Sequence, residues 1–424
     1  MSRYRLLATL IAATLALGLA GQLPRGPTAA AGAGAAEKLR VGHTIERMVV
    51  PGSAFGESRL VDVHLWYPAD HKKLSGSDKT FYTSALNGRP LPEPWAPLSW
   101  TVDAEIARED AAIDPRGKPF PVIVFSHGNV NDPIDYAHTL ELIAGAGFVV
   151  AAPYHVNNSQ DDVRIDFINA RAGAQLFPCN DGRPSPCSRT DVARSMEDRV
   201  RDISSILDHV PDWFGGRVDE SLAGVLGHSR GTVTALAAAG GSVQWGFEPE
   251  PRVKAIMGMA IGTQAITFGA DVADVKVPTL LVAGRLDRTS PHSVSEAAFE
   301  AITSDEKAFV SIEDAVHRSF DSTYCDQMQA SGKIAQANPN AILDRHTIQG
   351  IVNHPSSGRA MDYCSFASFT TPTDIRPLVA SLANPPFEVT ADTVPATGLN
   401  TDEVKLRMKE LAVKFFGKVL KRGH

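Results

Sequence analysis

The sequence has little of what would place it among metal-dependent, nucleic-acid-binding or membrane proteins. Only four of its 424 residues are cysteines, and no two of them have the Cys-x-x-Cys spacing typical of zinc sites. Its formal charge is −7 without any basic block, so no nucleic-acid partner is expected. The apolar stretch at residues 6–20 is 15 residues long, fewer than the roughly 20 that span a membrane. These features favour a globular protein without metal or nucleic acid.

The N-terminal segment has the pattern of a secretory signal peptide. Arg3 and Arg5 precede the apolar stretch, and a run of small residues at 28–36 follows it. We therefore expect residues 1–36 to be removed on export. The mature protein is then secreted or periplasmic and has no stable membrane span. A retained N-terminal anchor is the alternative.

Residues 37–424 are expected to form one α/β domain. Six short apolar runs, each with the character of a strand buried on both faces, lie at residues 122–125, 148–152, 224–226, 255–259, 279–283 and 308–312. Helical patterns lie between them, which predicts a mostly parallel central sheet with helices on both faces. The alternating residues 60–67 predict a half-buried strand towards an edge of that sheet, and residues 70–118 are interpreted as irregular covering structure.

Two segments interrupt this alternation of strands and helices, at about 156–190 and 320–400. Both are expected to be insertions over the carboxyl edge of the sheet, where such folds bind substrates. The four cysteines of an exported chain indicate two disulfides. Cys179 and Cys187 bracket a short loop and are expected to pair, which leaves Cys325 to Cys364, although the sequence alone allows three pairings.

The strongest chemical signal is Gly227-His228-Ser229-Arg230-Gly231, which lies between an apolar run and an Ala-rich helical segment. This is the Gly-x-Ser-x-Gly nucleophile elbow in the context that it requires. Side chains at Gly227 and Gly231 would collide with neighbouring backbone in so tight a turn. The turn presents the Ser229 hydroxyl at a helix N-terminus, where a developing anion is favoured. Ser229 is therefore the predicted nucleophile, and a helix-capping serine is the alternative.

A serine nucleophile needs a base and an acid that orients it, in the chain order Ser, acid, His for this type of site. Asp287 is the first acidic residue that directly follows a buried run after Ser229, whereas Asp271 and Asp274 precede that run. His317 follows the sixth run. These two residues are the predicted acid and base.

Two backbone N–H groups are expected to hold the oxyanion of the reaction. One belongs to Arg230, directly after the nucleophile, and the other to the loop after an early strand. That loop contains His127-Gly128-Asn129, so Asn129 is the predicted second donor, and His127 is interpreted as structural support.

Together these motifs resemble the platelet-activating-factor acetylhydrolase and dienelactone-hydrolase-like branch of the α/β-hydrolases. The matching segments are residues 63–69, 124–128, 226–231, 277–284 and the region around His317. The resemblance implies the α/β-hydrolase fold, a serine triad at Ser229, Asp287 and His317, no metal or other cofactor, and short or oxidised acyl esters as substrates. The elbow sequence is also similar to that of chlorophyllases. Arg230 stands where the branch usually has an apolar or aromatic residue.

The sequence thus predicts a secreted serine esterase that acts through an acyl-enzyme on small-molecule or lipid-like esters. An amidase or peptidase with the same triad is one alternative. A polyester hydrolase is another, and it predicts aromatic residues beside the serine, for which Trp245 and Phe247 are the candidates if they are not core residues. A non-catalytic binding protein is the third alternative.

Overall fold

The computed structural model describes most of residues 40–326 and the C-terminal helix. The described residues are 40–52, 58–70, 79–83, 101–159, 192–262, 270–287, 289–313, 315–324, 326 and 401–421, with scattered residues between 162 and 187. The expected signal peptide at 1–36 and nearly all of the expected insertion at 320–400 lie outside them. Of the helices in the described ranges, none has the length and apolar character that crossing a membrane requires.

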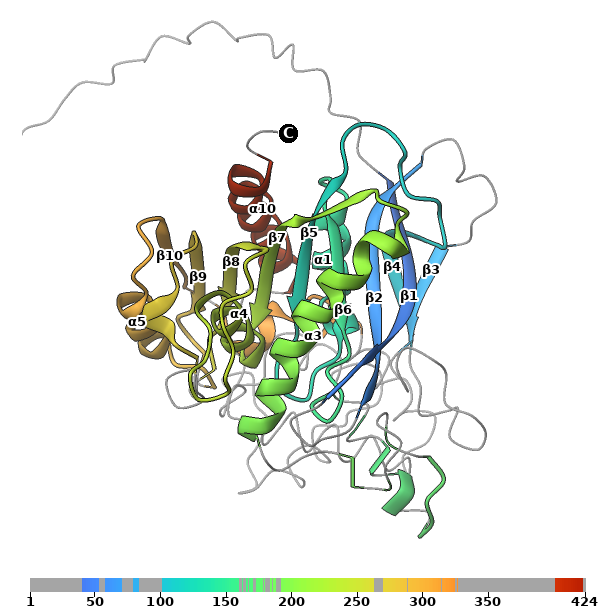
Figure 1. Cartoon of the computed structure of the whole chain (residues 1–424), viewed down its shortest axis with the longest axis horizontal. Helices are drawn as coiled ribbons and strands as arrows, with labels where there is room; N and C mark the ends of the chain where they lie inside the picture. Colours follow the sequence, from blue (N-terminus) through green and yellow to red (C-terminus); the bar gives the residue numbers. More distant parts are fainter. Residues whose placement is uncertain are drawn as a thin grey trace, which may run out of the picture. The chain divides into compact units, whose positions relative to one another are not determined.

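Ten strands of the described chain form one sheet, in the order β10-β9-β8-β7-β5-β6-β2-β1-β4-β3 (Figure 1). They are β1 (Arg40–Val50), β2 (Arg59–Ala69), β3 (Lys79–Thr83), β4 (Thr101–Glu109), β5 (Phe120–Ser126), β6 (Val149–Pro153), β7 (Val218–His228), β8 (Val253–Met259), β9 (Thr279–Gly284) and β10 (Lys307–Ile312). The six strands β5 to β10 pair in parallel. They contain the six apolar runs, so the prediction of a mostly parallel sheet is confirmed.

The N-terminal side of the sheet differs from the sequence prediction. β2 lies inside the sheet between β6 and β1, antiparallel to both, rather than towards an edge. Its polar residues are buried because partners satisfy them: Arg47 Nη2 donates to Asp62 at 2.8 Å, and His64 Nδ1 lies 2.8 Å from His43 Nε2. Residues 70–118, interpreted as irregular, contribute β3 and β4 to the edge of the sheet.

Helices cover both faces of the sheet, as predicted (Figure 1). They are α1 (Ala137–Ala144), α3 (Val192–Trp213), α4 (Arg230–Gly240), α5 (His292–Ala301) and α10 (Thr401–Leu420), with short 3-10 helices η2 (Pro133–Tyr136), η3 (Val272–Asp274) and η4 (His317–Phe320). One core cluster joins the sheet to apolar residues of α3, α4 and α5. A second cluster joins it to α1 and α10.

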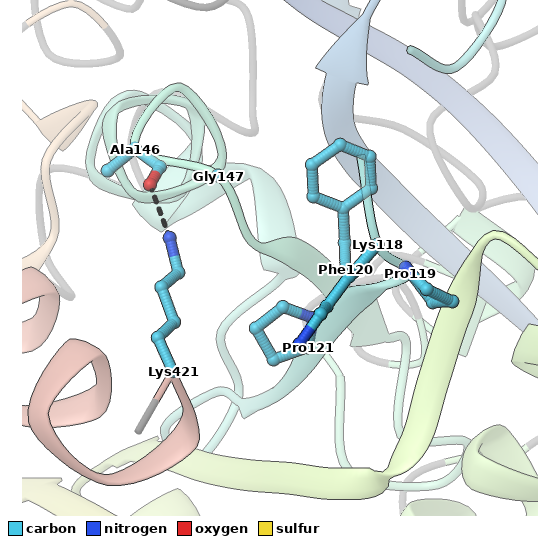
Figure 2. Close-up of a pocket in the computed structure, with 7 residues that line it drawn as sticks. All are labelled: Lys118, Pro119, Phe120, Pro121, Ala146, Gly147 and Lys421. Atoms are coloured by element: carbon cyan, nitrogen blue, oxygen red, sulfur yellow. Dashed lines mark hydrogen bonds between the residues drawn. The ribbon is translucent and has the colours of Figure 1, made fainter. Parts of the chain in front are cut away.

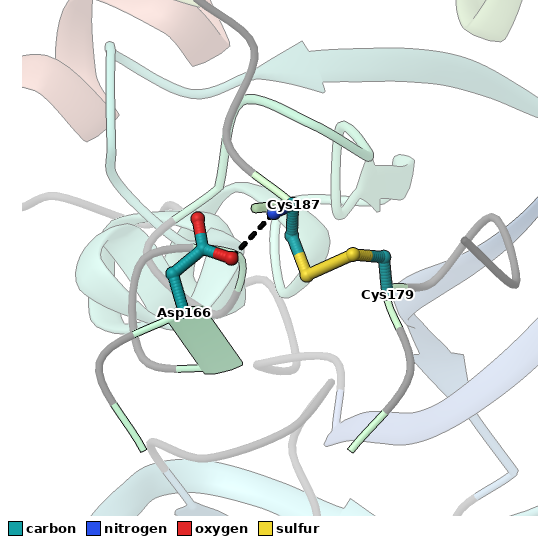
Figure 3. A group of neighbouring side chains, drawn as sticks. All are labelled: Asp166, Cys179 and Cys187. Atoms are coloured by element: carbon teal, nitrogen blue, oxygen red, sulfur yellow. Dashed lines mark hydrogen bonds between the residues drawn. A yellow bond between two sulfur atoms is a disulfide. The ribbon is translucent and has the colours of Figure 1, made fainter. Parts of the chain in front are cut away.

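The expected disulfide between Cys179 and Cys187 is present (Figure 3). Asp166 accepts a hydrogen bond from the backbone N–H of Cys187, and Ile165 packs against both cysteines. The two sulfurs and the Asp166 carboxylate are close enough to resemble a metal site. The sulfurs are bonded to each other, however, and so offer no thiolate to a metal. Cys325 and Cys364, expected to form the other pair, lie outside the described residues.

Candidate active site

Ser229 lies in a strained turn between strand β7 and helix α4. Its backbone has φ 54° and ψ −115°, a conformation that costs a residue with a Cβ on the order of 1–3 kcal/mol. The turn is held on both sides, since Ser229 N donates to Met259 O at 2.9 Å and Gly262 N donates to Ser229 O at 3.2 Å. This geometry is that of a nucleophile elbow.

The two glycines of the elbow are required by close backbone contacts. A Cβ on Gly227 would lie closer than 3.0 Å to the carbonyl of Gly231, and a Cβ on Gly231 equally close to the carbonyl of Ser126. Real Cβ atoms essentially never make contacts this short. The steric reason inferred from the sequence for both glycines therefore agrees with the structure.

Asp287 and His317 meet across the ends of two neighbouring strands. Asp287 follows β9, and His317 begins η4 after β10. The His317 Nδ1–H donates to Asp287 Oδ2 at 2.8 Å, and both residues are buried. The other carboxylate oxygen of Asp287 accepts the backbone N–H groups of Thr289 and Ser290 at 2.9 and 2.8 Å. An acid held in this way fixes the ring orientation and tautomer of its histidine, leaving Nε2 to act as a base.

His228, which sequence reasoning left without a role, links the elbow to His317. Its ring centroid lies 4.6 Å from that of His317. The Tyr136 hydroxyl lies 2.7 Å from His228 Nδ1, and the ring centroid of Phe320 lies 5.6 Å from that of His228. Burial lowers the pKa of His228 well below its usual value, and the nearby charge of His317 adds to this effect. A neutral His228, the residue directly before Ser229, therefore packs against His317.

The loop after β5 begins beside the elbow, at the neighbouring strand end. β5 and β7 are neighbours, with Ser126 opposite Gly227. Asn129 and Arg230 each lie three residues beyond these paired positions, and Asn129 is exposed. The first-turn amides of a helix point out of its N-terminus, and Arg230 is the first residue of α4. Both predicted oxyanion donors thus come from adjacent strand ends.

The Arg230 side chain, directly after the nucleophile in the sequence, is largely enclosed. It is 9% exposed, and burial lowers the pKa of its guanidinium to about 10. Since that value is still well above neutral, Arg230 contributes a positive charge beside the nucleophile at physiological pH.

Two other features lie away from these residues. A pocket of about 350 Å³ is lined by Phe120 and Pro121 at the start of β5 and by Lys421 after α10 (Figure 2). It is therefore at the amino end of β5, opposite to the end that leads to Asn129.

Trp245 and Phe247 follow the C-terminus of α4, an 11-residue helix of about 16 Å with Ser229 at its other end. Trp245 packs against the core, so the structure does not bring these aromatic residues beside the serine.

Four deeply buried histidines predict that the protein loses stability in mild acid. Burial lowers the pKa well below its usual value in each of His64, His127, His155 and His228. Below about pH 6.5 the unfolded chain takes up protons on these rings and the folded chain does not, so the free energy of unfolding falls. Burial also raises the pKa of Asp202 and of Asp321 to about 6, which opposes the effect because the folded chain protonates them first.

Because four histidines outweigh two carboxyl groups, we expect the Tm to fall between pH 6.5 and pH 5. The free energy of unfolding then falls by about 1.4 kcal/mol per pH unit for each net proton that the unfolded chain takes up. Circular-dichroism melts at several pH values measure it. His64→Gln removes one titrating group, so its slope should be smaller by one proton. A Tm that is constant or rises on acidification would contradict this account.

Two family models match the sequence. Residues 184–336 match the PET hydrolase-like family, and residues 95–165 match platelet-activating factor acetylhydrolase, isoform II. The first segment contains Ser229, Asp287 and His317, and the second contains Asn129. A search of curated protein sequences found no match.

Three of the solved structures that match this chain are two esterases and a dienelactone hydrolase. A ferulic acid esterase from Streptomyces cinnamoneus is 18% identical, with 92% of this chain and 93% of that chain covered and a TM-score of 0.49. A cold-adapted esterase from an Arctic intertidal metagenomic library is 14% identical, with 71% and 95% covered and a TM-score of 0.39. A dienelactone hydrolase from Anabaena variabilis is 17% identical, with 65% and 88% covered and a TM-score of 0.37.

Proposed function

We propose that Ser229, His317 and Asp287 form the catalytic triad of this chain, a carboxylic ester hydrolase whose sequence resembles the serine esterases of the α/β-hydrolase fold. The observation that carries the proposal is the 2.8 Å hydrogen bond from His317 Nδ1 to Asp287 Oδ2. His228, the residue directly before the strained Ser229, packs against the His317 ring. The sequence motif, the chain order of the three residues and the match over 184–336 support it independently.

The reaction proceeds in two acyl-transfer steps. His317 Nε2 accepts the Ser229 proton as the hydroxyl attacks the ester carbonyl, and the backbone N–H groups of Asn129 and Arg230 hold the oxyanion. His317 then gives the proton to the leaving alcohol, which departs and leaves an acyl-Ser229. Water that is activated by His317 attacks this acyl group and releases the acid, which regenerates Ser229.

Short-acyl esters are the proposed substrates, and export after removal of residues 1–36 is part of the same proposal. We expect kcat/KM to be highest for p-nitrophenyl acetate or butyrate and to fall by about tenfold or more for acyl chains of eight carbons and longer. A series of p-nitrophenyl esters measures this. A flat profile would contradict the short-acyl assignment.

Two further substrates separate the proposal from its alternatives. The anilide that matches p-nitrophenyl acetate should be cleaved far more slowly, whereas comparable rates would favour an amidase. The match to the PET hydrolase-like family favours a second candidate, hydrolysis of aromatic polyesters. Release of soluble acid from an amorphous polyester suspension, at a rate that exceeds turnover of soluble esters, would support that candidate instead.

A further inference from the structure

Arg199 is a buried cation that contacts the loop of the predicted oxyanion donor. It lies on α3 and has no exposed surface. Its Nη1 donates to His127 O at 2.6 Å and its Nη2 to Gly128 O at 3.0 Å. Nη1 also donates to Ser126 Oγ at 3.2 Å, and Nε donates to Asn158 Oδ1 at 2.8 Å. With a further Nη2 bond to Asn158, all five N–H groups of the guanidinium have acceptors.

These contacts determine the direction of one particular N–H group. The carbonyl of Gly128 and the N–H of Asn129 belong to the same planar trans peptide, so they point in opposite directions. The carbonyl receives a second hydrogen bond, from the His127 Nδ1–H at 2.8 Å. Since two buried donors hold the oxygen on the side of Arg199, the N–H of Asn129 is held pointing away from Arg199.

We propose that Arg199 is a positioning residue for the oxyanion hole, because its guanidinium fork fixes the Gly128–Asn129 peptide so that the Asn129 N–H faces the reacting ester. This inference rests on the proposed function, in which Asn129 donates to the oxyanion. Hydrogen bonding to the carbonyl also polarises the peptide, which makes its N–H a stronger donor.

The chemistry of the contacts requires an arginine. The two carbonyls belong to successive residues, and a planar fork spans both, whereas the single ammonium of a lysine binds as a point charge. The hydrogen-bond acceptors of Arg199 among the described residues include no carboxylate: they are oxygens of carbonyl, hydroxyl and amide groups, and Nη2 also lies 3.5 Å from His127 Nδ1. A buried guanidinium whose hydrogen bonds all go to neutral groups orients the dipoles of those groups strongly. A fixed orientation is what the N–H donor of an oxyanion hole needs.

Arg59 provides a matched control. It comes from β2, is 1% exposed, and binds the same helix by donating to Asp202 Oδ1 at 2.7 Å and to the carbonyl of Asp198 at 3.3 Å. None of its hydrogen bonds to described residues goes to 126–128. Arg59→Lys and Arg199→Lys are therefore the same chemical change at the same depth, one without and one with contact to the loop.

The test compares wild type, Arg199→Lys and Arg59→Lys on p-nitrophenyl acetate and on a trifluoromethyl ketone, which forms a tetrahedral oxyanion on the serine. For Arg199→Lys we expect kcat to fall about 100-fold with little change in KM, as for loss of one oxyanion donor. The ketone's inhibition constant should rise by a similar factor. Arg59→Lys should keep kcat and ketone affinity close to wild type. If Arg199 had a purely structural role, both variants would have a lower Tm, and Arg199→Lys would not show a fall in kcat at an unchanged KM.

Several outcomes would overturn the inference. An Arg199→Lys enzyme that keeps its kcat, or that loses ketone affinity no more than Arg59→Lys does, has no special role in the oxyanion hole. If Arg199→Lys does not fold, Asn158→Ala, which removes the acceptor that holds Nε, should show the same pattern more weakly, and an unchanged kcat there would refute the inference. A wild type that neither hydrolyses esters nor reacts with a fluorophosphonate would refute the proposed function itself.

Discussion

Ser229→Ala is expected to lower kcat on p-nitrophenyl acetate by on the order of 10⁶-fold, to the rate that the oxyanion hole and substrate binding alone supply. The fold should be retained. Alanine has the same Cβ as serine, so the strain at φ 54° is unchanged, and the hydrogen bonds that hold the turn involve only the backbone of residue 229. Thermal melts of both proteins verify this.

Ser242→Ala is the control for this experiment. Ser242 is also buried, but it lies beyond the C-terminus of α4, and its Oγ accepts the backbone N–H of Trp245 at 3.2 Å. The substitution should cost about 1 kcal/mol of stability and leave kcat near wild type. Comparable activity in Ser229→Ala and wild type would contradict the assignment of the nucleophile.

Asp287→Asn is expected to lower kcat about 10⁴-fold while it leaves the fold intact. The amide oxygen of asparagine can still accept the N–H groups of Thr289 and Ser290, so the turn after β9 keeps its hydrogen bonds. The side-chain NH₂ then faces His317 Nδ1, which must become an acceptor. The ring is held in the tautomer that carries its proton on Nε2, where it cannot accept the Ser229 proton.

Asp274→Asn separates this effect from a general loss of charge. Asp274 is an exposed carboxylate of η3, before β9 rather than after it. Its substitution should leave kcat unchanged, and both variants should have the wild-type Tm within a few degrees. If Asp274→Asn lost activity and Asp287→Asn did not, the acid would lie at the other end of the strand.

The parts of the fold that could be predicted are those for which the signal is local. Six apolar runs identified six parallel strands, and the steric reason for Gly227, the backbone of Gly231, lies within five residues of sequence. β2 was placed wrongly because Asp62 and His64 look like residues of an exposed face. Their partners Arg47 and His43 come from another strand, and pairing between strands leaves no mark in a short window of sequence.

In the site, too, the residues with a local sequence signal could be predicted and those defined by contacts between separate elements could not. Ser229, Asp287 and His317 each follow an apolar run, which is a local pattern, whereas the contacts of His228 and Arg199 depend on the packing of separate elements. A signal for Arg199 was nevertheless present. It lies three residues after Met196 and four before Ile203, which places a charged residue on the buried face of α3. A cation at a core position of an amphipathic helix needs partners, and here they are the carbonyls of the loop after β5.

Locating a covalent adduct tests the nucleophile most directly. Wild-type protein treated with a fluorophosphonate, digested and mapped by mass spectrometry should carry one phosphonyl group, on the peptide that contains Ser229, in parallel with the loss of esterase activity. Ser229→Ala treated in the same way should carry none. An adduct on a different serine that abolishes activity, or an adduct that persists in Ser229→Ala, would contradict the account.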